Sequence, residues 1–272
     1  MKRPQERKED FMTDYQIPQV WEWDQANDDL AGNRPTAGAR FDQSLPVGQG
    51  DLQIYSLGTP NGIKVAIMVQ ELLALGKISD QDYDLFKIKI GEGDQFGSDF
   101  VAINPNSKIP AMVDRSQTPA LPIFESGSIL LYLAEKYQAL LPDDLTGRTQ
   151  TLNWVFWQTG TGPYVGGGFG HFFHYAPTPQ KYPIDRFTME TKRQLDILDQ
   201  WFGDHAYMVG ENYTIADIMI WSWYGQLIKD DLYEGAAQFL AADTYKNLGT
   251  WADKIAARPA VQAALEMEYQ EI

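Results

Sequence analysis

A strand, a turn and the start of a helix follow one another closely around residue 60. Residues 52–58 read Leu-Gln-Ile-Tyr-Ser-Leu-Gly, Thr-Pro-Asn-Gly follows at 59–62, and apolar residues then recur at helical spacing from Val65 to Leu73. A turn of this kind directs backbone N–H groups and the positive end of a helix dipole at whatever lies before it. Because this environment suits a thiolate or a carboxylate, Thr59 and Asn61 become candidate site residues.

The rest of the first half alternates between strand and helix patterns. Three further strands are predicted, at 83–90, 111–113 and 121–124. Helices are predicted at 62–75, near 98–103 and over a stretch that carries Ile129 and Leu133. The order is therefore βαβαββα. Late neighbouring strands can join as a hairpin while early ones need crossover helices, so we expect a small mixed sheet with helices on its faces.

The second half of the chain is helical in pattern, and no strand-like alternation appears after about residue 150. Thr214 and Asp217 stand just before an apolar run, which predicts a capping box at a helix start. We therefore expect an α/β domain followed by an all-α domain. The predicted division is an extended N-terminal arm (1–50), the α/β domain (51–138), a linker (139–146) and the all-α domain (147–272).

The arm is rich in Pro, Gly, Asn, Gln and Asp and has no sustained period. Its two tryptophans, Trp21 and Trp23, would be unusual in a wholly disordered tail. We therefore expect part of the arm to pack on the body of the protein or on a partner subunit.

Charge and cysteine content exclude several classes of function. Lys and Arg number 22 against 37 Asp and Glu, so the formal net charge is −15 and the surface would repel nucleic acid and anionic lipid. There is no cysteine, which excludes disulfides, thiolate metal sites and cysteine nucleophiles, so any thiol chemistry must use the sulfur of a ligand. Residues 1–10 lack the apolar stretch of a signal peptide, and no stretch is apolar for long enough to span a membrane. We expect a cytoplasmic protein with neither nucleic acid nor membrane as a partner.

Several short motifs occur in a fixed order. Besides Thr-Pro-Asn-Gly at 59–62, they are Gly-Asp-Gln-Phe around Gln95, Asn-Ser-Lys-Ile-Pro at 106–110, Phe-Glu-Ser-Gly-Ser at 124–128 and His-Phe-Phe-His-Tyr-Ala-Pro at 171–177. With them, the chain over about 51–265 resembles the cytosolic glutathione transferase family, and within it the bacterial Nu class. The resemblance implies a thioredoxin-like first domain, a homodimer, glutathione as cosubstrate with two molecules per subunit, no metal, and glutathione-dependent disulfide reductase activity.

The resemblance also implies roles for individual residues. Thr59 and Asn61 would stabilise the glutathione thiolate, which is the nucleophile of a thiol whose pKa is otherwise about 8.5. The tripeptide itself would be held by Asn61, Gln95, Lys108, Ile109, Pro110, Glu125, Ser126 and Arg186. A cis Ile109–Pro110 bond would turn backbone groups toward the cysteinyl residue. Tyr175 and His174 would line the pocket for a second glutathione or the substrate.

Each of these residues also has a purely structural interpretation. Pro60, Asn61 and Gly62 favour turns in any protein, and Glu125 and Ser126 could simply cap a helix. Arg186 could form a surface salt bridge, and the aromatic stretch 169–175 could be core. Two other patterns are set aside. The glycine run 166–168 is better explained by a flexible loop than by phosphate binding, and His171 with His174 lacks the partners of a zinc site.

The leading hypothesis is a dimeric enzyme in which bound glutathione thiolate reduces small disulfides. Two alternatives remain open at this stage. One is conjugation of glutathione to electrophiles or reduction of peroxides. The other is a glutathione transferase fold used as a non-catalytic binding module, because a fold does not determine a function.

Overall fold

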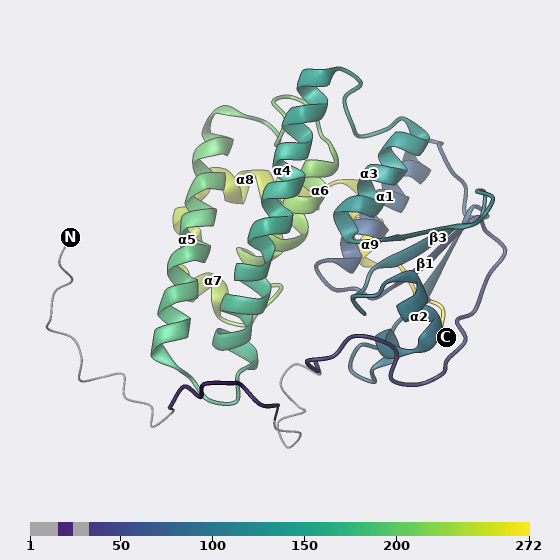
Figure 1. Ribbon diagram of the computed structural model, residues 1–272. Coiled ribbons are helices and arrows are strands. Elements are labelled where there is room, and N and C mark those ends of the chain that lie inside the picture. Colours follow the sequence, from purple (N-terminus) through teal and green to yellow (C-terminus); the bar gives the residue numbers. More distant parts are fainter. Residues whose placement is uncertain (1–15, 24–32) are drawn as a thin grey trace, which may run out of the picture.

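The computed structural model describes residues 16–23 and 33–272. Two units lie side by side (Figure 1), one built on a β-sheet and the other on two long upright helices, α4 (Leu145–Pro163) and α5 (Lys181–Asp204). None of the helices in the described part of the chain combines the length and apolar composition needed to cross a membrane.

The sheet has four strands in the order β2-β1-β3-β4. They are β1 (Leu52–Ser56), β2 (Tyr83–Lys87), β3 (Ala111–Asp114) and β4 (Leu121–Phe124). β1 pairs in parallel with β2, whereas the β1–β3 and β3–β4 pairs are antiparallel. The mixed sheet predicted from the βαβαββα order is confirmed.

Every residue of β1 is buried because helices cover both faces of the sheet. Leu52 and Ile54 face the main apolar core, which they share with α1 (Gly62–Ala74) and α3 (Ser126–Tyr137). Tyr55 points the other way into a smaller cluster with Phe86 and with Phe100 of α2 (Ser98–Ile103). The sheet thus forms the middle layer of this unit.

Strand β2 is shorter than predicted and ends at Lys87 rather than Ile90. β1 ends at Ser56, whose carbonyl accepts the N–H of Ile88, so the following residues have no strand to pair with. The outer edge of β2 is covered by the C-terminal segment. Lys87 donates its N–H to the Gln270 carbonyl at 2.7 Å, and the Gln270 N–H donates to Leu85 at 2.9 Å. This segment therefore protects backbone groups that an edge strand would expose.

The second unit is all-helical, as predicted. Beyond α4 and α5 it contains α6 (Ile215–Ile220), α7 (Ala236–Phe239), α8 (Lys246–Ala256), α9 (Pro259–Leu265), the π-helical segments η3 (Tyr164–Tyr175) and η4 (Trp221–Gly225), and the 3₁₀ turn η5 (Ala242–Thr244). The capping box is confirmed, since Thr214 accepts the Ala216 N–H and Asp217 accepts the Thr214 N–H.

The glycine run at 166–168 lies within the helical segment η3, so the expected flexible loop is wrong. The glycines allow close packing instead. A Cβ at Gly168 would come within 2.3 Å of the Phe187 ring, and one at Gly170 within 2.2 Å of Tyr233. Small residues are required here because two aromatic side chains lie directly against the helix backbone.

The part of the arm from residue 33 onward is anchored to the body of the protein. Arg40 donates its N–H to the Phe96 carbonyl at 2.8 Å and places its guanidinium 3.3 Å from the centre of the Phe96 ring. The Tyr55 hydroxyl donates to the Pro46 carbonyl. Trp21, in contrast, is 62% exposed. Part of the arm therefore packs on the body, while residues 1–15 and 24–32 lie outside the described residues.

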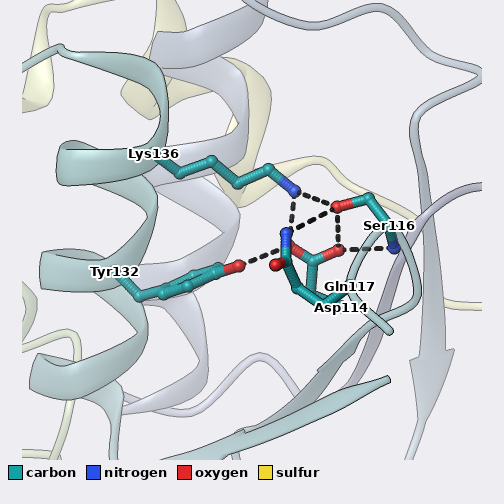
Figure 2. Close-up of polar contacts among 5 residues, drawn as sticks. All are labelled: Asp114, Ser116, Gln117, Tyr132 and Lys136. Atoms are coloured by element: carbon teal, nitrogen blue, oxygen red, sulfur yellow. Dashed lines mark hydrogen bonds and ion pairs between the residues drawn. The ribbon is translucent and has the colours of Figure 1, made fainter. Parts of the chain in front are cut away.

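A buried carboxylate ties α3 to the end of β3 (Figure 2). Asp114 accepts hydrogen bonds from the Tyr132 hydroxyl at 2.6 Å, from the backbone and hydroxyl of Ser116, and from the Lys136 ammonium. Burial opposes its ionisation, but the hydrogen bonds from Lys136, Ser116 and Tyr132 together outweigh it and lower the pKa of Asp114. The cluster lies at the opposite end of β3 from Pro110 and therefore supports the fold rather than the site.

A second buried ion pair joins the two units. Glu71 on α1 accepts two hydrogen bonds from Arg258, at 2.7 Å from Nε and 2.9 Å from Nη2. The guanidinium also lies 3.6 Å from the centre of the Tyr213 ring. The pair therefore ties the C-terminal part of α1, the helix that follows the Thr59–Asn61 turn, to the helical unit.

Candidate active site

A cavity of about 650 Å³ lies between the two units, where the turn before α1, the loop before β3, the start of α3 and the end of α4 meet. Nine of the eleven predicted site residues line it: Thr59, Asn61, Gln95, Lys108, Ile109, Pro110, Glu125, Ser126 and Tyr175. Its size falls within the range of sites for small ligands, roughly 300–1,000 Å³.

Arg186 and His174 are the two predicted residues that do not line this cavity. Arg186 is exposed on α5. The ring of His174 lies 4.8 Å from that of Tyr175 and 5.7 Å from that of Tyr233, both of which do line it. The roles assigned to Arg186 and His174 stay predictions.

The turn before α1 is organised by Thr59. Its hydroxyl oxygen accepts the Gly62 N–H at 3.3 Å, and its carbonyl accepts the Ile63 N–H at 2.8 Å. A Cβ at Gly62 would lie 1.8 Å from the Leu57 carbonyl oxygen, so this turn requires glycine. The expectation that these first N–H groups of the helix point at a ligand is wrong, because Thr59 takes both. The Thr59 hydroxyl hydrogen remains available as a donor.

Asn61 has a defined amide orientation. Its Oδ1 accepts hydrogen bonds from Lys64 Nζ and from Trp223 Nε1, both at 2.9 Å. An ammonium and an indole N–H are donors only, so the atom between them must be the carbonyl oxygen. The NH2 group of Asn61 is therefore the part of the side chain left for a ligand, and it suits an anion.

The loop before β3 carries the Ile109–Pro110 peptide bond, which is cis as the resemblance implies. Asn104 holds this loop. Its Nδ2 donates to the Lys108 carbonyl at 2.6 Å and its Oδ1 accepts the Asn106 N–H at 2.9 Å. The Lys108 ammonium donates to Asn33 of the arm at 3.0 Å. Burial, reinforced by the charge of Arg40, lowers the pKa of Lys108.

Glu125 and Ser126 begin α3 in an unusual conformation. Glu125 has a φ of 69°, a region that residues other than glycine rarely adopt, and such residues cluster at functional sites. Its side chain is exposed and forms no cap hydrogen bond. Ser126 is 7% exposed, and its Oγ accepts from Lys64 Nζ at 3.3 Å. The Ser126 hydroxyl hydrogen is therefore free to donate to a ligand.

Gln95 lies in the 3₁₀ turn η2 (Asp94–Phe96) and is 8% exposed. Its Nε2 donates weakly to the Ile90 carbonyl at 3.3 Å. Its Oε1 is buried and has no hydrogen-bond partner among the described residues. A buried acceptor without a partner is costly, so a ligand N–H group that reached this amide would lower that cost.

Tyr55 and Ser56 are hydroxyl-bearing residues close to this turn in sequence, but they lie outside the cavity. Tyr55 is 2% exposed and donates its hydroxyl to Pro46, while burial raises its pKa to about 12. Ser56 is fully buried at the end of β1. Neither lines the cavity, so the Thr59–Asn61 turn carries the donors.

Lys64, Gln158 and Trp223 are among the cavity residues that the sequence prediction did not include. Lys64 is 1% exposed, and burial lowers its pKa to about 7 although the nearby charge of Glu125 opposes the shift. One signal was available in the sequence. A lysine in the first turn of a helix opposes the helix dipole, and such local conflicts often mark functional sites.

A metal centre has no support in the structure. Within 16–23 and 33–272, no three His, Asp or Glu side chains are grouped so that they could hold a metal ion. The expectation of a metal-free site stays a prediction.

The arrangement of the cavity agrees with the comparisons with known proteins. The family model for the glutathione S-transferase N-terminal domain matches residues 57–135, and that for the C-terminal domain matches residues 169–259. The chain belongs to the glutathione S-transferase family. The first match contains the Thr59–Asn61 turn, the cis-proline loop and the start of α3, so more than half of the residues that line the cavity lie in the matched N-terminal domain.

Individual glutathione transferases are similar over most of the chain. The disulfide-bond oxidoreductase YghU of Escherichia coli is 52% identical over 255 residues, which cover 92% of this chain and 88% of the relative. The crystal structure of glutathione transferase YghU from Streptococcus pneumoniae, complexed with glutathione, superposes with a TM-score of 0.92 at 58% identity and covers 95% of this chain and 99% of its own.

Another solved structure is similar at lower sequence identity. A glutathione transferase from Burkholderia graminis, with two glutathione molecules bound per subunit, has a TM-score of 0.72 at 37% identity. The match covers 79% of this chain and 87% of that chain.

Proposed function

We propose that this protein is a glutathione-dependent disulfide-bond oxidoreductase of the glutathione transferase type. The observation that carries the proposal is the donor arrangement in the cavity. Asn61 presents its NH2 group and Thr59 and Ser126 their hydroxyl hydrogens, while the chain contains no cysteine of its own. A thiolate held at this turn must therefore belong to a ligand, and glutathione is the thiol bound by the similar Streptococcus pneumoniae enzyme.

Different cavity residues bind different parts of glutathione. Ser126 and the start of α3 suit the γ-glutamyl carboxylate, and the Glu125 carboxylate suits the γ-glutamyl ammonium. The loop with Lys108, Ile109 and the cis-proline holds the middle of the ligand. We expect Gln95, which lines the cavity, to contact the glycyl end through its side-chain amide.

The reaction uses two glutathione molecules and no protein sulfur. The thiolate of the first, stabilised by Thr59 and Asn61, attacks one sulfur of a small disulfide, so that a mixed disulfide forms and one substrate thiolate leaves and takes up a proton. The thiolate of a second glutathione then attacks the glutathione sulfur of the mixed disulfide. Glutathione disulfide forms, and the second substrate thiol is released.

The second glutathione has room beside Tyr175 and Tyr233. Both rings line the cavity on the side of the helical unit, where Gly166 and Gly167 contribute no side chains. Two bound molecules in the Burkholderia graminis enzyme support this occupancy. We assign the protein to the Nu class on the motifs around Thr59, Lys108 and Glu125.

The proposal includes a cytoplasmic homodimer and the division into an arm (1–50), a thioredoxin-like domain (51–138), a linker (139–146) and an all-helical domain (147–272). Exposed apolar side chains on β4 and α4 support a partner subunit. Leu121 is 40% exposed, Phe124 39% and Phe156 64%. A second copy of the chain would cover such side chains.

Steady-state assays test the proposal. We expect turnover of 2-hydroxyethyl disulfide at fixed glutathione to exceed turnover of an aryl halide and of a hydroperoxide. Faster conjugation or peroxide reduction would identify a different reaction at the same site. Glutathione binding without turnover of any of the three would indicate a binding module.

A further inference from the structure

The lysine in the first turn of α1 is the most completely buried charge in the cavity wall. Lys64 is 1% exposed, and it is one of the largest fully buried side chains of the described chain. Its ammonium donates to Asn61 Oδ1 at 2.9 Å, to Gln158 Oε1 at 2.8 Å and to Ser126 Oγ at 3.3 Å. The three oxygens come from the turn, from α4 and from the start of α3.

All three partners of Lys64 are neutral. Among the described residues no carboxylate forms an ion pair with it, and Glu125 acts on it only through its nearby charge. A buried cation without a counterion is costly, so such a group requires a compensating role. An anion bound in the cavity would supply the missing negative charge. It would also raise the pKa of Lys64 from the value of about 7 to which burial lowers it, so the ammonium stays charged beside the ligand.

The contacts of Lys64 determine how its partners face the ligand. An ammonium has three hydrogens and no acceptor, so each partner must offer it an oxygen. Asn61 then has its NH2 left, Ser126 its hydroxyl hydrogen and Gln158 its Nε2. The last lies beside Gly162, where a Cβ would come within 2.6 Å of it. Each partner is thereby left with a hydrogen-bond donor.

We propose that Lys64 is a positioning residue that sets the hydrogen-bond polarity of the glutathione site, so that Asn61 and Ser126 present donors to the thiolate and the γ-glutamyl carboxylate. Its positive charge adds to the potential at the bound sulfur. The inference rests on the proposed function, because it requires glutathione to bind with its sulfur at Asn61. Trp223 helps to fix the orientation of the Asn61 amide, since its indole N–H donates to the same Asn61 oxygen.

Other ionisable groups also act on the bound sulfur. The side chains with titratable groups that line the cavity are Lys64, Lys108, Glu125, Tyr175 and Tyr233. Lys108 is drawn toward Asn33 of the arm, and Glu125 has the opposite sign. Of these groups, only Lys64 contacts both Asn61 and Ser126. Its removal should therefore change both the pKa of the bound thiol and the rate of disulfide reduction.

The test is a thiol titration of glutathione bound to the full-length Lys64→Met variant, followed by thiolate absorbance in the ultraviolet. Methionine keeps the unbranched shape and removes the charge and all three donors. We expect the pKa of the bound thiol to rise by about 1 unit or more, since an opposite charge within a few ångströms shifts a pKa by this amount. Reduction of 2-hydroxyethyl disulfide at pH 7 should fall by about 10-fold and recover partly at higher pH.

The matched control is Lys192→Met. Lys192 is a partly buried lysine on α5 whose ammonium donates to the Leu240 carbonyl, away from the cavity. Its loss should leave both the thiol pKa and the reductase rate unchanged. If Lys64→Met does not fold, Lys64→Gln removes the charge and keeps an N–H donor on a shorter side chain, and the same rise in thiol pKa is expected.

A folded Lys64 variant with the wild-type thiol pKa would overturn the inference and leave the proposed function intact. A wild-type protein that binds glutathione without lowering its thiol pKa, or that reduces no disulfide, would overturn the proposed function instead. Trp223→Phe separates the two effects of Lys64. It should slow turnover with little change in the thiol pKa, because the charge remains while the Asn61 amide loses one of its two restraints.

Discussion

Replacing the Asn61 amide by a carboxylate is the sharpest test of the thiolate site. In Asn61→Asp one carboxylate oxygen still accepts the hydrogen bonds of Lys64 and Trp223, so the packing is preserved. The other oxygen replaces the NH2 group and faces the glutathione sulfur as an acceptor. The variant therefore removes one donor to the thiolate and adds a negative charge beside it.

The expected loss in the rate of disulfide reduction follows from these two changes. A hydrogen bond to a charged group contributes about 1.5–3 kcal/mol, which corresponds to about 10- to 160-fold in rate. Repulsion between the carboxylate and the thiolate increases the loss, while Lys64, 2.9 Å from the Asn61 oxygen, partly neutralises it. We therefore expect disulfide reduction at pH 7 to fall by at least about 10-fold. Affinity for S-methylglutathione, which lacks the thiol, should change much less because Glu125 and Ser126 are intact.

The assay is the rate of 2-hydroxyethyl disulfide reduction at fixed glutathione between pH 6 and pH 9, a window that brackets the free thiol pKa of about 8.5. Asn153→Asp is the control, because Asn153 is exposed on α4 and does not line this cavity. Wild-type rates for Asn61→Asp across the whole range would refute the assignment. Thr59 or Tyr175 would then be the next candidate donor.

Three further predictions concern binding and stability. Ser126→Ala should weaken glutathione binding by about 1–3 kcal/mol in calorimetry, because the ligand carboxylate loses a donor; unchanged affinity would contradict the anchor. Arg258→Met should lower the free energy of unfolding in urea by about 3–5 kcal/mol, since it leaves Glu71 buried and unpaired, whereas the double variant with Glu71→Leu should recover most of the loss. Asp114→Asn should destabilise the protein at pH 7. The folded-state pKa of Asp114 is lowered, so its contribution is present above the unfolded value of about 3.9 and is lost as the pH falls below it. A stability difference between Asp114→Asn and wild type that persists unchanged to pH 2 would contradict this.

Local patterns predicted the elements well because each element is specified by nearby residues. The α2 helix (Ser98–Ile103) and strand β4 (Leu121–Phe124) have the predicted bounds, and the Thr214–Asp217 capping box involves residues three apart. Strand β2 was predicted too long because its end depends on where its partner β1 stops, which is a property of the pairing. The glycine run of η3 was misjudged for a similar reason, because its packing partners Phe187 and Tyr233 are distant in sequence.

The sequence by itself determined the absence of cysteine, the acidic charge, the order of strands and helices, and the motifs at Thr59, Pro110 and Ser126. Only the tertiary structure decided how these motifs act together. Lys64 meets Ser126 and Gln158 across 62 and 94 residues of chain, and Trp223 meets Asn61 across 162. The direction of a hydrogen bond depends on the group it meets, so the donors that the cavity offers to an anion exist only once these distant segments have packed together.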